Sequence, residues 1–80
     1  MIRVQFKLSG PLRDYYHTDR PRRGETVFLA DGADVGVLVR RYAIPPARVH
    51  IVVVNRGRAD LATRLTDGDT VWLLPLAAGG

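Results

Sequence analysis

The sequence predicts an α+β domain in which one main helix lies across a sheet of about five strands. Three features support this: strict alternation of apolar and polar residues at positions 2–8, an amphipathic helical pattern at positions 35–42, and two later apolar runs at positions 49–54 and 70–75. With 80 residues, 46% of them hydrophobic, the chain can bury one modest core. We expect one domain at residues 1–75, followed by a flexible tail at residues 76–80.

The first two expected elements are strands. Apolar residues alternate with polar ones from Ile2 to Leu8, which predicts a strand with one buried face. Ser9-Gly10-Pro11 ends this strand, and a short turn at residues 12–16 leads into a basic loop. Residues 26–30 form the second expected strand, which ends at Asp31-Gly32.

The helix follows directly. Asp34 is placed to accept hydrogen bonds from the free amides of the first turn. Four apolar residues then recur at helical spacing, with Arg40 and Arg41 near the end that favours cations: Val35, Leu38, Val39 and Tyr42. Ile44-Pro45-Pro46 ends the helix. Because the helix has one apolar face, it needs a sheet that covers this face.

The last third of the chain predicts three strands. Residues 49–54 are mostly β-branched, which indicates a strand buried on much of both faces. Asn55-Arg56-Gly57 is a turn, and residues 58–60 return as a short strand. Leu61 and Leu65 anchor an irregular connection, and Asp67-Gly68-Asp69 is a tight turn before the strand at residues 70–75.

Alternation along this last strand separates its side chains between two faces. If Val71 and Leu73 face the helix, Trp72 and Leu74 lie on the opposite face, which a single helix cannot cover. We therefore predict that Trp72 and Leu74 contribute to a partner-docking patch. The alternative is that a loop covers them.

Composition excludes several classes of site. The absence of cysteine removes disulfides, thiolate nucleophiles, iron–sulfur ligation and cysteine zinc sites. His17 and His50 lie far apart with no carboxylate at ligand spacing, so neither a metal site nor a catalytic group is expected. The apolar runs are too short to span a membrane, and a soluble cytoplasmic protein is the expectation.

The formal charge of +4 raises the question of nucleic-acid binding. Much of the excess lies in the polar segment from Gly10 to Gly24, where Tyr15 and Tyr16 could stack on bases. The other arginines are scattered, as on an ordinary solvated surface. An RNA-binding module therefore remains one alternative, although a nucleic-acid partner is not the main expectation.

The carboxyl terminus Gly79-Gly80 directly follows the last strand. Glycine has no Cβ, so such a tail can thread a narrow channel and present its terminal carboxylate. An ionised carboxylate is a poor electrophile, and it needs activation, for example as an acyl-adenylate made by an ATP-dependent partner. The alternative is an ordinary frayed end.

The chain resembles the ThiS/MoaD family of ubiquitin-like sulfur carriers in several features taken together. These are the order of elements, the Ile44-Pro45-Pro46 helix stop, the run from Val52 to Gly57, the turn and strand from Leu65 to Val71, and the final Gly79-Gly80. The resemblance implies a ubiquitin-like β-grasp fold with a mixed sheet. It also implies that Gly80 is adenylated by an E1-like activating enzyme that uses ATP, with no cofactor bound to the chain itself. The product is a thiocarboxylate that donates sulfur.

The resemblance further implies which parts of the chain serve that role. Tail recognition would involve the residues before the activated glycine: Leu76, Ala77, Ala78 and Gly79. Partners would be the activating enzyme, a sulfurtransferase or other sulfur source, and a sulfur-accepting synthase subunit. The chain would be a carrier rather than an enzyme, although it could be the small subunit of an enzyme complex. Molybdopterin, thiamine, cysteine and natural-product pathways all remain open, as does a ubiquitin-like modifier joined to lysines.

Overall fold

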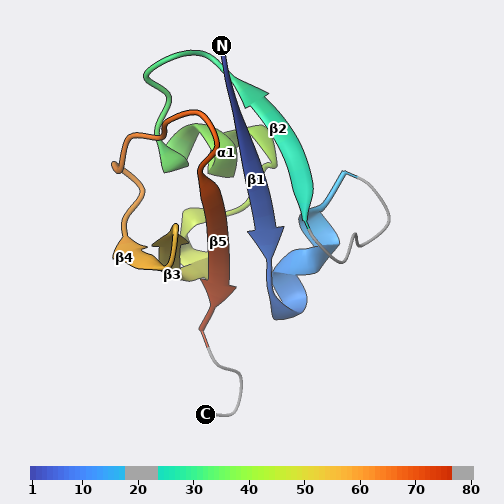
Figure 1. Ribbon diagram of the computed structural model, residues 1–80. Helices are drawn as coiled ribbons and strands as arrows, with labels where there is room; N and C mark the ends of the chain where they lie inside the picture. The colour runs from blue at the N-terminus through green and yellow to red at the C-terminus, as the bar shows by residue number, and fades with distance from the viewer. Residues whose placement is uncertain (18–23, 77–80) are drawn as a thin grey trace.

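The computed structural model describes residues 1–17 and 24–76. Within them the chain forms five strands, one α-helix and two short 3₁₀ helices (Figure 1): β1 Ile2–Leu8, η1 Gly10–Tyr15, β2 Glu25–Leu29, α1 Val35–Arg41, η2 Pro46–Arg48, β3 Val49–Val54, β4 Gly57–Ala59 and β5 Thr70–Pro75. The predicted α+β class is confirmed. The second strand begins and ends one residue earlier than expected, and so does the fourth.

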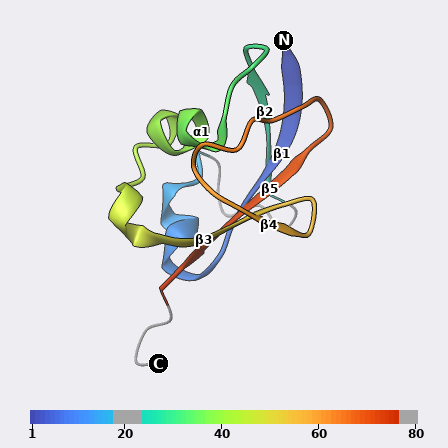
Figure 2. The ribbon, with the colours of Figure 1, turned by 90° about the vertical axis from the view of Figure 1, so that its left-hand side faces the viewer.

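The five strands form one mixed sheet in the order β2-β1-β5-β3-β4. The central pair, β1 and β5, is parallel, and the other pairs are antiparallel. Figure 2 shows α1 on one side of this sheet, so the sheet has a helix face and an outer face. The predicted arrangement of one main helix across a five-stranded sheet is therefore confirmed.

The core lies between α1 and the helix face of the sheet. Phe6, Leu73 and Leu38 are fully buried there, and the aromatic ring of Phe6 packs 4.6 Å from that of Tyr42. The four apolar residues predicted for the helix face are all buried. Asp34 caps the helix as expected, since its Oδ1 accepts the Val37 amide at 3.1 Å.

The outer face differs from what the sequence predicted for β3. Only Val52 of this strand is buried, whereas Ile51 and Val53 are half-buried. The reason is that α1 covers one face of the sheet, and no helix of the described residues lies over the other. The expectation that β3 is buried on much of both faces was therefore wrong for its outer side chains.

The hairpin that joins β3 to β4 has a two-residue turn, because Val54 pairs with Gly57. Both turn residues have positive φ, 51° at Asn55 and 72° at Arg56. This is the backbone of the turns that match the twist of antiparallel strands. Asn accepts such a conformation readily, but Arg does so at a steric cost.

Candidate functional site

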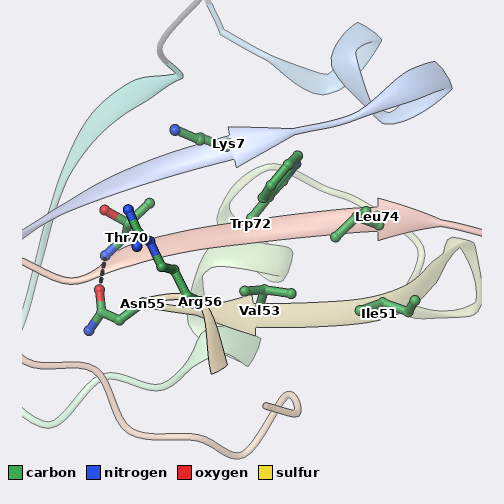
Figure 3. Close-up of a pocket in the computed structure, with 8 residues that line it drawn as sticks. All are labelled: Lys7, Ile51, Val53, Asn55, Arg56, Thr70, Trp72 and Leu74. Atoms are coloured by element: carbon green, nitrogen blue, oxygen red, sulfur yellow. Dashed lines mark hydrogen bonds between the residues drawn. The ribbon is translucent and has the colours of Figure 1, made fainter. Parts of the chain in front are cut away.

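The outer face of the sheet contains an apolar groove (Figure 3). Strands β1, β5 and β3 bring its residues together, and their side chains stand on the same side of the sheet. The eight lining residues are Lys7, Ile51, Val53, Asn55, Arg56, Thr70, Trp72 and Leu74. The groove has a volume of about 670 Å³. It joins both residues of the predicted docking patch to six others.

Trp72 stands at the centre of this groove. It pairs with Lys7 on one side and with Val53 on the other, and its side chain remains 41% exposed. Its indole N–H donates a hydrogen bond to the Ser9 hydroxyl, which fixes the ring across the sheet. Leu74 is half-buried beside Ile51. No loop of the described residues covers Trp72, so its ring is available for contact.

One end of the groove is held in place by a polar network at the β3–β4 turn. The Asn55 side chain accepts the Thr70 amide at 2.9 Å and donates to Asp69 at 2.7 Å. Asp69 also accepts from the amide and the hydroxyl of Thr66. Burial raises the pKa of the Asp69 carboxyl, but these hydrogen bonds outweigh burial and hold the pKa below its usual range. The carboxylate therefore ties the hairpin to the start of β5.

The tail begins where β5 ends. Pro75 is the last strand residue and pairs with Val49, and the next residue, Leu76, is 67% exposed. Gly10 allows η1 to approach this point, since a Cβ added there would lie 3.3 Å from a ring carbon of Pro75. The predicted tail residues Ala77, Ala78, Gly79 and Gly80 lie outside the described residues. The structure thus describes the exposed root of the tail.

The aromatic residues beside the basic segment are engaged in the fold. Tyr16 is half-buried, and its hydroxyl accepts the Leu8 amide at 2.7 Å. Tyr15 packs against the core. The His17 ring stacks on that of Tyr42, with centroids 4.0 Å apart. Tyr15 and Tyr16 are therefore partly buried against the core. Residues 18–23, which hold three of the segment's arginines, lie outside the described residues.

The described part of the chain has neither a metal-type cluster nor a membrane-spanning helix. Among residues 1–17 and 24–76, no three His, Cys, Asp or Glu side chains gather as a metal site requires. No helix in the described part of the chain is long and apolar enough to cross a bilayer. The groove holds the predicted docking residues Trp72 and Leu74, and the exposed Leu76 begins the predicted tail.

The comparisons concern sequence and structure separately. No protein-family model and no curated protein matches the sequence. Among solved structures, a protein assigned as molybdopterin converting factor subunit 1, from Pyrococcus furiosus, is 19% identical with a TM-score of 0.72, and the match covers 96% of this chain and 100% of that one. Small archaeal modifier protein 1 of Haloferax volcanii is 26% identical with a TM-score of 0.71, over 98% of this chain and 99% of that one.

A third similar structure is the HVO 2177 protein of Haloferax volcanii. It is 21% identical with a TM-score of 0.72, and the match covers 99% of this chain and 87% of that one. These matches extend over nearly the whole of each chain, so they concern the entire sheet and helix rather than one motif. The resemblance expected from the sequence is thereby confirmed at the level of the fold. This chain has a ubiquitin-like β-grasp fold of the ThiS/MoaD type.

Proposed function

We propose that this chain is a sulfur carrier whose Gly80 carboxylate is converted to a thiocarboxylate. The observation that supports this best is the combination of a ThiS/MoaD-type fold with Gly79-Gly80 at the end of the chain, five residues after β5. The root of that tail is exposed at Leu76. Extended, residues 76–80 would reach about 17 Å into a partner's active site.

The chemistry proceeds in two steps on the partner. A free α-carboxyl group has a pKa of about 3.5, so the Gly80 carboxyl is ionised at neutral pH. In this ionised form its carbon resists nucleophilic attack. An activating enzyme uses ATP to attach AMP to this carboxylate and releases pyrophosphate. Hydrosulfide, supplied by a sulfurtransferase or another source, then attacks the acyl carbon and displaces AMP, and the resulting thiocarboxylate donates its sulfur to an acceptor.

In this proposal the chain itself supplies a surface that partners recognise and a narrow tail. The catalytic groups would belong to the partner enzyme. We propose that Trp72 and Leu74 dock the activating enzyme, that the tail from Leu76 to Gly79 is read inside its channel, and that Gly80 alone is modified. The acceptor is a synthase subunit, of the molybdopterin type or of a related pathway, and the cytoplasm supplies the ATP.

A second candidate function is that of a protein modifier. It is favoured by the 26% identity to small archaeal modifier protein 1 of Haloferax volcanii. The activation step is the same, and only the attacking group differs: a lysine amine of another protein instead of a sulfur nucleophile. The outcome of activation thus distinguishes the two functions.

The test is intact-mass spectrometry of the chain purified from its native host without a carboxyl-terminal tag. A mass gain equal to the difference between sulfur and oxygen, mapped to Gly80, would support the carrier. Adducts that join Gly80 to lysines of other proteins would support the modifier. A carboxylate that persists after incubation with ATP and host extract would contradict both. A variant that lacks Gly79 and Gly80 serves as the control, because it should show neither product.

A further inference from the structure

The groove on the outer face is apolar in its centre and cationic at its edges. Trp72, Val53 and Leu74 form the centre, while Lys7 and Arg56 line the edges. Arg58 pairs with Val53 and therefore projects from the same face on the next strand. No carboxylate is among the described residues that line the groove.

Two carboxylates of the sheet and its turns are bound within the fold. The Glu25 carboxylate accepts a hydrogen bond of 2.7 Å from the Tyr42 hydroxyl on the helix face. Asp69 is buried and binds Asn55 and Thr66 at the turn. The positive charge around the groove is therefore not balanced by these two groups, and a docked surface would meet Lys7, Arg56 and Arg58 together.

Lys7 has a special place among these cations, because it is the only lysine of the chain. It is half-buried, and it lies beside Trp72 in the register of β1 and β5. Since both side chains line the groove, we expect a partner that fills it to cover the Lys7 amine as well as the Trp72 ring. Any group attached to that amine would in turn occupy the groove.

We propose that the groove receives an apolar segment of the activating enzyme that is flanked by carboxylates, and that modification of the Lys7 amine and activation of Gly80 exclude each other. This inference rests on the proposed function. The apolar centre favours a protein segment over a nucleic acid, since that centre offers one aromatic ring and otherwise aliphatic side chains. The cationic edge selects the sign of the partner's charges and speeds encounter.

The same arrangement limits what a modifier could do. A copy that carries a conjugate on Lys7 could not return to the activating enzyme, because the conjugate would block the groove. In polymers linked through Lys7, each copy would therefore have to be activated before its own Lys7 receives a conjugate. For a sulfur carrier, acylation of Lys7 would stop sulfur loading without any change at the tail.

The first test is amine footprinting with the N-hydroxysuccinimide ester of acetic acid. The probe partner is the host's activating enzyme, purified by following exchange of pyrophosphate into ATP that depends on this chain. Met1 provides an internal reference, since its amine is the other reactive amine of the chain and pairs with Asp31 at the far end of β1 (Figure 1). With excess enzyme and no ATP, acetylation of Lys7 should fall about fivefold or more, whereas that of Met1 stays unchanged. An unprotected Lys7 would overturn the proposal.

The second test measures the chain concentration that gives half-maximal exchange. Lys7→Glu and Arg58→Glu should each raise it about tenfold, and the matched charge reversal Arg40→Glu, on α1, should leave it unchanged. Chain acetylated at Lys7 should behave like Lys7→Glu. If wild-type and reversed chains exchange alike, the docking inference fails while the proposed function stands. If the wild-type chain supports no exchange with any host fraction, the proposed function fails and this inference with it.

Fluorescence of Trp72, the only tryptophan, tests the alternative that the groove binds nucleic acid. Saturable binding of an oligouridylate that is lost in Lys7→Glu and abolished by added salt would make the groove a nucleic-acid surface, and would overturn the proposal.

Discussion

Replacement of Trp72 by Ala offers the sharpest test of the groove as a docking surface. The Trp72 side chain is 41% exposed, and a partner that covers the groove would bury that part. An aromatic side chain of this size offers about 250 Å² in all, so about 100 Å² would be buried on docking. At about 25 cal/mol per Å², this area contributes about 2.5 kcal/mol to binding. The affinity for the activating enzyme should therefore fall about 60-fold.

The assay is the chain concentration at half-maximal pyrophosphate exchange, measured with the variant and the wild-type chain side by side. Trp72→Ala also removes the hydrogen bond to Ser9, which costs about 1 kcal/mol of folding stability, so thermal unfolding must show that the variant is folded at the assay temperature. Phe28→Ala is the matched control. Phe28 is 57% exposed on the same sheet face, but it lies on β2 and does not line the groove.

We expect the Phe28 variant to match the wild-type chain within error. A folded Trp72→Ala chain that is activated at the wild-type concentration would refute the reasoning, because the area argument would then concern a surface that the enzyme does not touch. An equal loss in both variants would also refute it. Such a result would point to a general effect of lost aromatic surface rather than to the groove.

Three further predictions concern the stability of the fold. Arg56→Gly should raise the free energy of unfolding by about 1 kcal/mol in urea titrations, because glycine accepts the φ of 72° without the steric cost that Arg pays; a loss would contradict this. Gly24→Ala should destabilise the chain far more than Gly32→Ala in the same titrations. Both glycines have positive φ, but an added Cβ at Gly24 would lie 2.3 Å from the Phe6 carbonyl oxygen, whereas a Cβ at Gly32 would have no atom within 4 Å. Equal losses of stability would mean that the positive φ alone, and not the clash, sets the cost. Asp69→Asn should cost about 1–3 kcal/mol at pH 7. Since the folded pKa of Asp69 is lowered, the wild-type chain loses this contribution as pH falls below 3.8 towards that pKa, so the two unfolding curves should converge in acid; a constant difference would refute the role given to the carboxylate.

Local signals in the sequence were sufficient for most elements of the fold. The alternation in β1, the cap at Asp34 and the helical spacing of α1 each depend on residues within one turn or one strand of each other. The two faces of β5 followed from alternation alone, and Val71 and Trp72 lie where that pattern put them. A pattern of period two is sufficient here because a one-residue shift would exchange the buried and exposed sides.

The groove itself could be predicted only in part. Trp72 and Leu74 were expected on the outer face, but their neighbours Ile51 and Val53 come from a strand whose place beside β5 is set by pairing between distant residues. Lys7 joins them because β1 and β5 pair in parallel across more than sixty residues of chain. The alternation of β1 did put Lys7 on the outer side of its strand. No local pattern, however, indicates which strand lies next to it.

The turn at Arg56 shows a different limit. The order Asn55-Arg56-Gly57 suggests that glycine takes the position with positive φ, but the register puts Gly57 in β4 and leaves Arg56 in the turn. Pairing of Val54 with Gly57 decides the matter, because the turn then has only two residues. Arg56 thereby projects at the edge of the groove, where its charge faces a docked partner.

The position of the groove relative to the tail also bears on the chemistry proposed for Gly80. Strand β5 presents Trp72 and Leu74 outward and then continues into the tail after Pro75, so a partner held at the groove has the carboxylate tethered within about 17 Å of Leu76. Tethering makes the second encounter intramolecular and raises its effective concentration. If docking encloses Lys7 as proposed, the chain's only lysine is also withheld from the acyl-adenylate while that adenylate exists. The same contact would then keep the reactive carbon near the enzyme and the chain's own amine away from it, which leaves the incoming sulfur as the nucleophile.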